Sequence, residues 1–345
     1  MINNAPAPPS ALFSPLRLRE LDLANRIVVS PMCQYSAQDG VPNAWHFVHY
    51  GSLANSGAGL VVVEATHVEA RGRITPGCLG LYNDAQEEAL ARIYKDGRRL
   101  GSARIGIQLG HAGRKASACR PWEGRGALSG GEAWETIAAS AAPFGEGWHM
   151  PRAATRRDMD DMLNAFADAA RRAARIGFDE LELHAAHGYL LHNFLSPLCN
   201  FRDDAYGGSF DNRTRFPLEV IRGVRAHWPA EKPFGVRLSV TDWKDGGWTV
   251  EDSIQFARLL RDAGVDFVCL SSAGATADIK VPARPGYQWQ FSRRLRTEAG
   301  IKTRAVGLIR TAAEAKRIIA EGHADLVALA RAFLYDPHWA WRAAN

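Results

Sequence analysis

Short apolar segments alternate with amphipathic helical segments along the chain, and this alternation constrains the fold more than any other feature. The apolar segments are only four to six residues long and rich in Val, Ile and Leu, as buried parallel strands are. We place them at residues 26–30, 60–64, 104–109, 180–184, 234–238, 267–271, 303–306 and 326–329. About eight β/α units in 345 residues predict a (β/α)8 TIM barrel, and a doubly wound sheet is the second fold compatible with the alternation.

The segments between the strands have the pattern of amphipathic helices. We place these helices at residues 85–100, 158–176, 215–228, 250–263, 291–299 and 312–321. Several are followed by a glycine, such as Gly177 or Gly264, which is the usual residue just beyond a helix C-terminus. No Gly-x-Gly-x-x-Gly motif follows the first strand, so the sequence favours the barrel over a dinucleotide-binding sheet.

Two segments do not fit the simple alternation. Residues 16–21 alternate between apolar and charged side chains, which predicts an N-terminal hairpin that closes the bottom of the barrel. Residues 111–157 follow the third strand and are unusually long for a connection inside a compact domain. We therefore expect residues 1–345 to form one domain, with an insertion at 111–157 that covers the site as a lid. A merely decorative surface insertion is the alternative.

Composition and charge argue against several classes of protein. The net charge is +5 without a block of five or more basic residues, which disfavours nucleic-acid binding. No apolar run approaches the length of a membrane span, and residues 1–9 lack the basic start and apolar core of a signal peptide. The five cysteines are odd in number and include no Cys-x-x-Cys motif, so we expect neither disulfides nor an iron–sulfur cluster, and a cytoplasmic location.

The most informative chemistry follows the strand at 180–184, where His184, His187 and Tyr189 lie at the junction with a helix. In a β/α barrel this junction is at the C-terminal face, where active sites are built. Imidazoles stabilise a developing oxyanion and a phenol delivers a proton, which suits reduction of an electron-poor double bond. Two alternatives are a metal-dependent lyase or hydrolase, with Glu64 as the nearest further ligand, and ordinary packing.

The first strand leads into a second group of functional candidates. Pro31 lacks a backbone donor, while the amides on either side of it are free to bind a flat polar heterocycle. Met32 offers an apolar surface, Cys33 a polarizable thiol and Tyr35 a phenol. For a single cysteine, a buried structural role is the alternative to a functional one.

Polar residues at the ends of other strands indicate a charged cofactor. Gln108 has a donor and an acceptor with which to read an amide-like edge, and Arg237 is costly inside a barrel unless an anion or an electron-rich ring meets it. The ends of the seventh and eighth strands carry Gly307, Ala330 and Arg331, where barrels typically bind phosphate. Small residues there allow backbone amides to approach the phosphate closely.

From about Leu12 to its C-terminus the chain resembles the Old Yellow Enzyme flavoproteins, in the branch called thermophilic-like. The resemblance is carried by several short motifs that occur in the family's order. They are Ser30-Pro31-Met32-Cys33-Gln34-Tyr35, Glu64-Ala65-Thr66, Gln108-Leu109, His111-Ala112-Gly113-Arg114-Lys115, residues 184–189 and residues 200–209.

The resemblance implies that FMN binds at the barrel mouth. Its ring would lie against Ser30, Pro31, Met32 and Cys33, above Ala65, with Gln108 on the pyrimidine edge and Arg237 beside the pole that gains negative charge on reduction. Gly307, Ala330 and Arg331 would hold the phosphate. Ala330 stands where the family commonly has glycine.

The resemblance also implies an ene-reductase that works by a ping-pong cycle. NADPH would reduce the flavin, and an enone, nitroalkene or quinone would then bind in the same pocket. His184 and His187 would hold the substrate oxygen with Tyr35 opposite, hydride would pass from flavin N5 to the β-carbon, and Tyr189 would protonate the α-carbon. We also expect a homo-oligomer. A flavin-binding protein without turnover is a further alternative.

Overall fold

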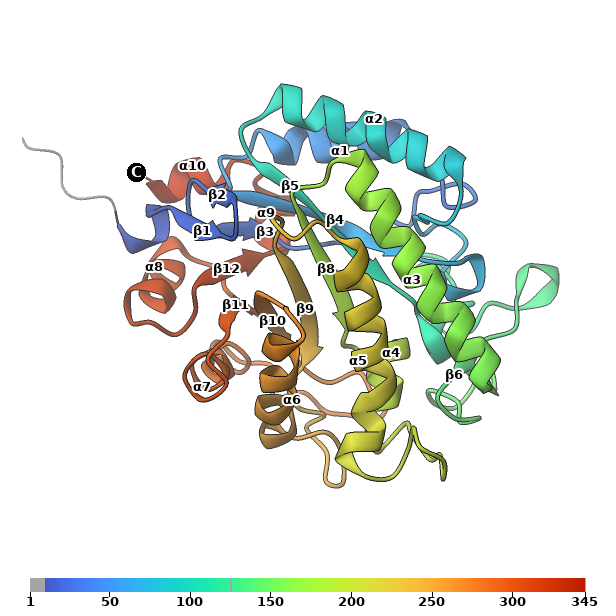
Figure 1. Ribbon diagram of the computed structural model, residues 1–345. Coiled ribbons are helices and arrows are strands. Elements are labelled where there is room, and N and C mark those ends of the chain that lie inside the picture. Colours follow the sequence, from blue (N-terminus) through green and yellow to red (C-terminus); the bar gives the residue numbers. More distant parts are fainter. Residues whose placement is uncertain (1–9, 125, 345) are drawn as a thin grey trace, which may run out of the picture.

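A computed structural model describes residues 10–124 and 126–344 and forms a closed barrel of eight parallel strands. Hydrogen bonds connect neighbouring strands in the order β10-β11-β12-β3-β4-β5-β8-β9, and β9 pairs with β10 to close the barrel (Figure 1). Their bounds are β3 Ile27–Val29, β4 Leu60–His67, β5 Arg104–Gly110, β8 Glu180–Ala185, β9 Phe234–Ser239, β10 Phe267–Ser271, β11 Lys302–Val306 and β12 Leu326–Leu329. All eight predicted strands are present, which confirms the (β/α)8 barrel and rejects the doubly wound sheet.

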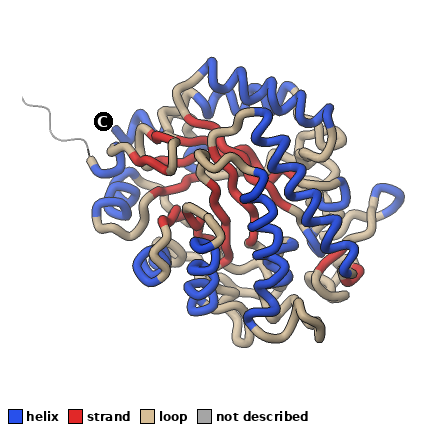
Figure 2. The backbone as a smooth tube through the Cα atoms, in the orientation of Figure 1, coloured by secondary structure: helices blue, strands red, loops and turns tan. Residues whose placement is uncertain are grey.

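Helices surround the strands, as the blue and red segments of Figure 2 show. Their bounds are α1 Ala44–Ala54, α2 Asp84–Leu100, α3 Arg156–Ile176, α4 Leu190–Leu195, α5 Phe210–His227, α6 Val250–Asp262, α7 Gln290–Glu298, α8 Ala312–Ala320, α9 Arg331–Tyr335 and α10 Trp339–Ala344. The predicted helices are all present, although α5 begins at Phe210 rather than at residue 215. Among the described residues, none of the helices is both long enough and apolar enough to cross a membrane.

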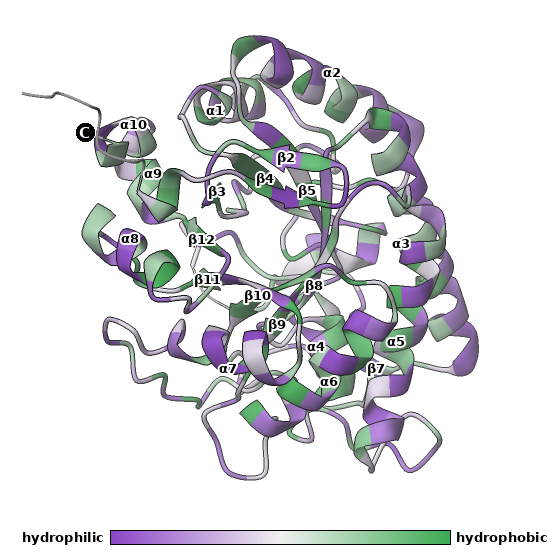
Figure 3. Cartoon of the chain, turned by 60° about the vertical axis from the view of Figure 1, so that its left-hand side comes forward, coloured by the Kyte–Doolittle hydropathy of each residue, from purple (hydrophilic) through white to green (hydrophobic). Residues whose placement is uncertain are grey.

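The longest helix, α3, illustrates how the sequence defines these elements. It begins with a capping box, because the Thr155 side chain accepts from the Asp158 amide and the Asp158 side chain accepts from the Thr155 amide. It ends at Gly177, whose φ of 106° is left-handed. One face buries residues such as Phe166 against the barrel, and Figure 3 shows apolar and polar residues interspersed along α2 and α3.

The predicted hairpin is present at the N-terminal end of the barrel. Its strands β1 Leu16–Leu18 and β2 Leu21–Leu23 pair antiparallel. Leu18, Leu21 and Leu23 are buried in one cluster with the lower barrel side chains, including Phe267. The hairpin therefore closes the bottom of the barrel and leaves the opposite, C-terminal mouth for the site.

Before α3 begins at Arg156, the insertion at 111–157 contains only short elements. These are η3 Gly113–Lys115, η4 Gly130–Glu132, β6 Ile137–Ala138 and β7 Arg152–Ala153. The buried Arg114 joins two parts of the segment and connects it to the loop after β10, because its guanidinium donates to the carbonyl oxygens of Ala142 at 3.0 Å and Ala275 at 2.5 Å. The role of the insertion as a lid stays a prediction, and the predicted lack of a signal peptide concerns residues 1–9, which lie outside the described residues.

Candidate active site

Three of the candidate residues, His184, His187 and Tyr189, lie together at the end of β8. The Nε2 atom of His184 is 3.0 Å from Nδ1 of His187, and Nε2 of His187 is 2.5 Å from the Ser271 hydroxyl at the end of β10. The Tyr189 ring packs edge-on to His184 with ring centroids 4.7 Å apart. The fold therefore places two imidazoles and a phenol in one cluster at the barrel mouth.

The protonation states of this cluster follow from its burial. Burial, followed by the positive charge of Arg237, lowers the pKa of His184 and of His187 well below the ordinary value. Burial also raises the pKa of the Tyr189 phenol well above its ordinary value. At neutral pH the cluster holds neutral imidazoles and a protonated phenol, so it can offer N–H and O–H donors to a substrate oxygen or carbon.

The turn that carries His187 is conformationally unusual and firmly held. His187 has φ of 60°, in the left-handed region that a side chain with a Cβ seldom adopts. Its amide donates to the Ser239 hydroxyl at 2.9 Å, and its carbonyl accepts from the Lys115 ammonium at 2.9 Å. These contacts join β9 and the insertion to the turn and fix the direction of the imidazole.

The segment after β3 forms a second wall of the site. Its start is fixed by the Ser30 amide, which donates to the Leu329 carbonyl at 2.9 Å, and Met32, Cys33 and Tyr35 are half-buried. Burial raises the pKa of the Cys33 thiol well above its ordinary value. The thiol is therefore neutral, and a neutral thiol is a poor nucleophile.

A buried carboxyl group, that of Glu64, holds the backbone of this segment. Its oxygens accept from the Gln34 amide at 2.8 Å and from the Tyr50 hydroxyl at 3.1 Å. Burial raises its pKa to about 8. Ala65 follows at a β-bulge in β4 and is also buried. Glu64 thus serves the backbone of the 30–36 segment instead of completing a metal site with His184.

A charged network that sequence reasoning missed lies inside the barrel. Gln108 on β5 donates to the Glu182 carboxylate on β8 at 2.6 Å. Arg304 on β11 donates to Glu182 at 3.1 Å and to Glu180 at 2.5 Å, and all three charged side chains are fully buried. Burial raises the pKa of Glu180 to about 7, and the attraction of Arg304 opposes that rise. The sequence did contain a signal of this network, because Glu180 and Glu182 are acidic residues in an otherwise apolar strand.

Arg237 and the ends of β11 and β12 form the cationic part of the mouth. The Arg237 guanidinium lies 3.5 Å from the Ser30 hydroxyl, and its buried Nε has no hydrogen-bond partner among residues 10–124 and 126–344. A cavity of about 400 Å³ lies at the ends of β11 and β12. The cavity is lined by Val306, Gly307, Leu308, Ile309, Arg310, Ala328, Leu329, Ala330, Arg331, Ala332 and Tyr335.

These features fit FMN. The unpartnered Arg237 nitrogen can meet an electron-rich ring, the Gln108 amide can read a pyrimidine edge, and small residues with Arg331 surround a space for a phosphate. A catalytic metal fits less well. Across the described part of the chain, no group of three or more His, Cys, Asp and Glu side chains is arranged to hold a metal ion.

A closed β/α barrel with neutral donors beside a cationic mouth defines a cofactor-dependent barrel oxidoreductase. The chain belongs to the NADH:flavin oxidoreductase / NADH oxidase family, whose profile matches residues 11–345. It is therefore a flavin-dependent enzyme with FMN as its cofactor, and the resemblance to the Old Yellow Enzyme flavoproteins is confirmed.

Individual relatives agree with this assignment. An NADPH dehydrogenase of Geobacillus sp. (strain WCH70) is 44% identical over 336 residues, covering 97% of this chain and 94% of the relative. Morphinone reductase in complex with tetrahydroNAD is 28% identical with a TM-score of 0.79, covering 96% and 90%. The old yellow enzyme homologue from Zymomonas mobilis is 26% identical with a TM-score of 0.79, covering 96% and 92%.

Proposed function

We propose that this enzyme uses NADPH to reduce the C=C bond of α,β-unsaturated carbonyl compounds. The observation that carries the proposal is the cluster of His184, His187 and Tyr189, two neutral imidazoles and a protonated phenol in mutual contact at the barrel mouth. An enone presents one oxygen that must be polarised and one carbon that must be protonated. Within the cluster the N–H of His184 faces His187, and the N–H of His187 faces Ser271. A substrate oxygen would replace these acceptors, and the Tyr189 O–H would supply the proton.

The roles of the residues follow from their chemistry. FMN, when bound, supplies the hydride. The imidazoles of His184 and His187 bind the substrate oxygen, and Tyr35 approaches that oxygen from the other wall. Tyr189 gives its phenolic proton to the α-carbon, which its raised pKa permits because the proton is retained until the substrate carbon becomes basic.

The cofactor is proposed to be held by the strand ends around the mouth. Ser30, Pro31, Met32, Cys33 and Ala65 contact the ring, Gln108 reads its pyrimidine edge, and Arg237 stabilises negative charge on it. The phosphate lies among Gly307, Ala330 and Arg331. NADPH as the reductant is supported by the name of the Geobacillus relative, and enones, nitroalkenes or quinones by the single acceptor oxygen that each presents.

The visible spectrum of the purified protein, recorded without oxygen before and after NADPH is added, tests the proposal. We expect a flavin spectrum that bleaches with NADPH and recovers with 2-cyclohexenone. A flavin that bleaches but does not recover with any enone, nitroalkene or quinone would contradict the substrate class. A flavin that NADPH leaves oxidised would favour a binding protein, and loss of activity to a chelator would favour the metal-dependent lyase or hydrolase.

We further propose a homo-oligomer. The support is an apolar surface on α1, α9 and α10, where Trp45, Val48, Leu334, Tyr335 and Trp341 are exposed, Tyr335 by 94%. Trp45 and Leu334 also line a cavity with Met32 and Cys33, so this surface adjoins the proposed site. Light scattering should give a mass above one 37.8 kDa chain. Tyr335→Glu should lower that mass, and a wild-type monomer would contradict the proposal.

A cytoplasmic location is also proposed. All five cysteines are free thiols in the described structure, three of them buried, as in proteins of reducing compartments. Fractionation of the native cells should place the protein in the soluble fraction, and recovery with secreted proteins would contradict this location.

A further inference from the structure

We propose that Asp242, acting through His192, is a positioning residue for the turn that directs His187 and Tyr189. The inference rests on the proposed roles of those two side chains. Asp242 and His192 are both fully buried, and neither is among the side chains proposed to contact the substrate. They act on the backbone amide of Gly188, the residue between the two proposed catalytic ones.

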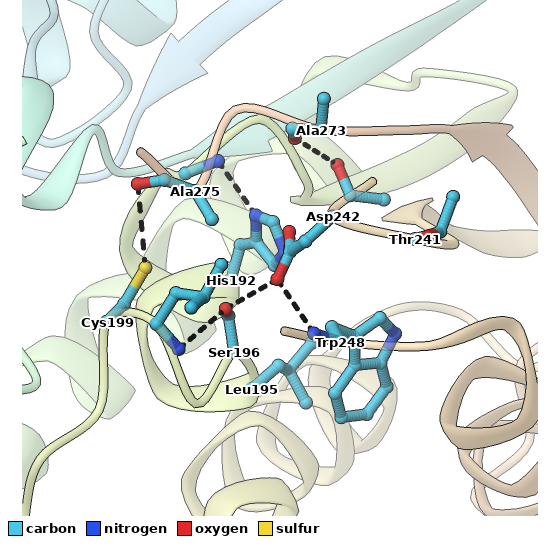
Figure 4. Close-up of polar contacts among 12 residues, drawn as sticks. His192, Leu195, Ser196, Cys199, Thr241, Asp242, Trp248, Ala273 and Ala275 are labelled. Atoms are coloured by element: carbon cyan, nitrogen blue, oxygen red, sulfur yellow. Dashed lines mark hydrogen bonds and ion pairs between the residues drawn. The ribbon is translucent and has the colours of Figure 1, made fainter. Parts of the chain in front are cut away.

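The contacts form a continuous chain from the end of β9 to the turn, and Figure 4 shows the Asp242 end of it. The Gly188 amide donates to Nδ1 of His192 at 2.8 Å. On the far side of the ring, Nε2 of His192 lies 3.2 Å from Oδ1 of Asp242. Neither of these two atoms makes a hydrogen bond of standard geometry within residues 10–124 and 126–344, so the 3.2 Å approach is a close polar contact in which each is the partner available to the other.

The second carboxylate oxygen of Asp242 is held independently of His192. It accepts from the Ser196 hydroxyl at 2.6 Å and from the Trp248 amide at 2.8 Å (Figure 4). The Trp248 donor is a backbone amide that no side-chain substitution removes, and the other oxygen of the carboxylate faces His192. Burial opposes ionisation of Asp242, but the His192 and Ser196 contacts keep its pKa below the ordinary value.

This arrangement selects one tautomer of His192. Because the Gly188 amide donates to Nδ1, the proton of the neutral ring must be on Nε2. A carboxylate only accepts, so Asp242 stabilises that same tautomer from the other side. A fixed tautomer keeps an acceptor directed at the Gly188 amide, in the way that a partner carboxylate orients a functional histidine.

The turn needs such an anchor because two adjacent residues are left-handed. His187 has φ of 60° and Gly188 has φ of 74°, a conformation that costs energy for His187 and persists only where its surroundings hold it. The turn is also tightly packed, since a Cβ on Gly188 would come within 1.8 Å of the Gly274 carbonyl oxygen. Loss of the His192 acceptor would leave a buried amide unpaired and allow the turn to relax.

Asp242→Asn is a sharp test because the amide is nearly isosteric with the carboxylate but cannot satisfy every donor. If its oxygen faces the Trp248 amide, its nitrogen faces His192, which must then move its proton to Nδ1 against the Gly188 amide. If its oxygen faces His192, its nitrogen opposes the Trp248 amide. Ser196→Ala is the matched control, because it removes a buried donor to Asp242 and leaves the His192 ring untouched.

The experiment compares two ways of reoxidising the dithionite-reduced holoenzyme. Reoxidation by 2-cyclohexenone needs the positioned imidazoles and phenol, whereas reoxidation by oxygen does not. For Asp242→Asn we expect the rate with cyclohexenone and the affinity for 4-nitrophenol to fall about tenfold, as loss of one buried hydrogen bond predicts. The rate of reoxidation by oxygen and the FMN content should stay near wild type. Ser196→Ala should leave both reoxidation rates, the 4-nitrophenol affinity and the FMN content nearly unchanged.

Three results would overturn the inference. One is an Asp242→Asn enzyme that matches Ser196→Ala in both cyclohexenone rate and 4-nitrophenol affinity. Another is an equal fall in the cyclohexenone and oxygen rates, which indicates general damage. If the variant does not fold, nitrogen NMR of the wild-type holoenzyme decides, because a proton on Nδ1 of His192 contradicts the inference. A wild-type enzyme that cyclohexenone does not reoxidise would instead refute the proposed function.

Discussion

Gln108 and Glu182 form a buried hydrogen bond of 2.6 Å between adjacent strands of the barrel, with the amide as donor and the carboxylate as acceptor. Because a carboxylate has no proton to give, Glu182 requires the nitrogen of Gln108 to face it. The amide oxygen and its second N–H are then free for another partner. This orientation suits the imide edge of a flavin, which presents a donor flanked by acceptors.

Glu182→Gln should weaken FMN binding. The substituted side chain could donate as well as accept, so the orientation of Gln108 would no longer be fixed. We expect the dissociation constant of FMN, measured by flavin fluorescence, to rise about tenfold, the cost of one charged hydrogen bond. Glu180→Gln is the control, because Glu180 also contacts Arg304 and makes no hydrogen bond to Gln108. Equal losses of FMN affinity in both variants would show that binding depends on the total charge of the two carboxylates and not on the orientation of the Gln108 amide.

Tyr189→Phe should separate the two halves of the catalytic cycle. Only the proton donor is lost, so the rate of alkene reduction should fall by about 100-fold, within the usual range for general acids. Flavin reduction by NADPH requires no proton from Tyr189 and should change little. Stopped-flow absorbance measures both steps on one preparation. If both steps slow equally, Tyr189 supports the pocket and is not its proton donor.

Cys33→Ala should leave the enzyme active. The Cys33 thiol is held neutral by burial, and it faces a cavity of about 480 Å³ that Met32 and Trp122 also line. Loss of a weak S–H donor should lower the flavin midpoint potential by roughly 30 mV, equivalent to about 1.4 kcal/mol for two electrons. A spectroelectrochemical titration measures this shift. Complete inactivation would instead indicate covalent chemistry at Cys33.

The barrel could be predicted from the sequence because its strands are short apolar runs separated by helical periodicity. All eight predicted strands joined the barrel in the structure. Helix α1 escaped prediction because residues 44–54 are apolar on most sides and have little amphipathic contrast. Its start is a capping box, in which the Asn43 side chain accepts from the Trp45 amide at 3.0 Å and Nδ1 of His46 accepts from the Asn43 amide at 3.1 Å, and a histidine is not a usual signal for that position.

The candidate site was predictable only in part. Residues close together in the sequence, such as His184 and His187, could be expected to meet because one strand end carries them both. The partners of the positioning residues come from distant strands. Arg304 is 122 residues from Glu182, and periodicity shows that a strand residue points inward without showing which residue it meets. The Asp242–His192 contact escaped prediction for the same reason.

Glu64 should make the stability of the protein depend on pH. Its pKa is about 8 in the folded protein against an ordinary value of 4.5, so the folded state binds the proton more tightly than the unfolded state. The stabilisation is therefore complete below pH 4.5 and is lost as the pH rises through about 8. One pKa unit corresponds to about 1.4 kcal/mol, so the whole effect amounts to a few kcal/mol.

Glu64→Gln removes this titration while retaining an acceptor for the Gln34 amide. We expect urea unfolding of the wild type to show a free energy of unfolding that decreases between about pH 5 and about pH 8.5, relative to the variant. Glu88→Gln, on the exposed face of α2, is the control and should run parallel to the wild type because its side chain is 69% exposed. Should the Glu64→Gln curve also run parallel, then the carboxyl is ionised in the folded protein, and the two donors at Glu64 outweigh its burial.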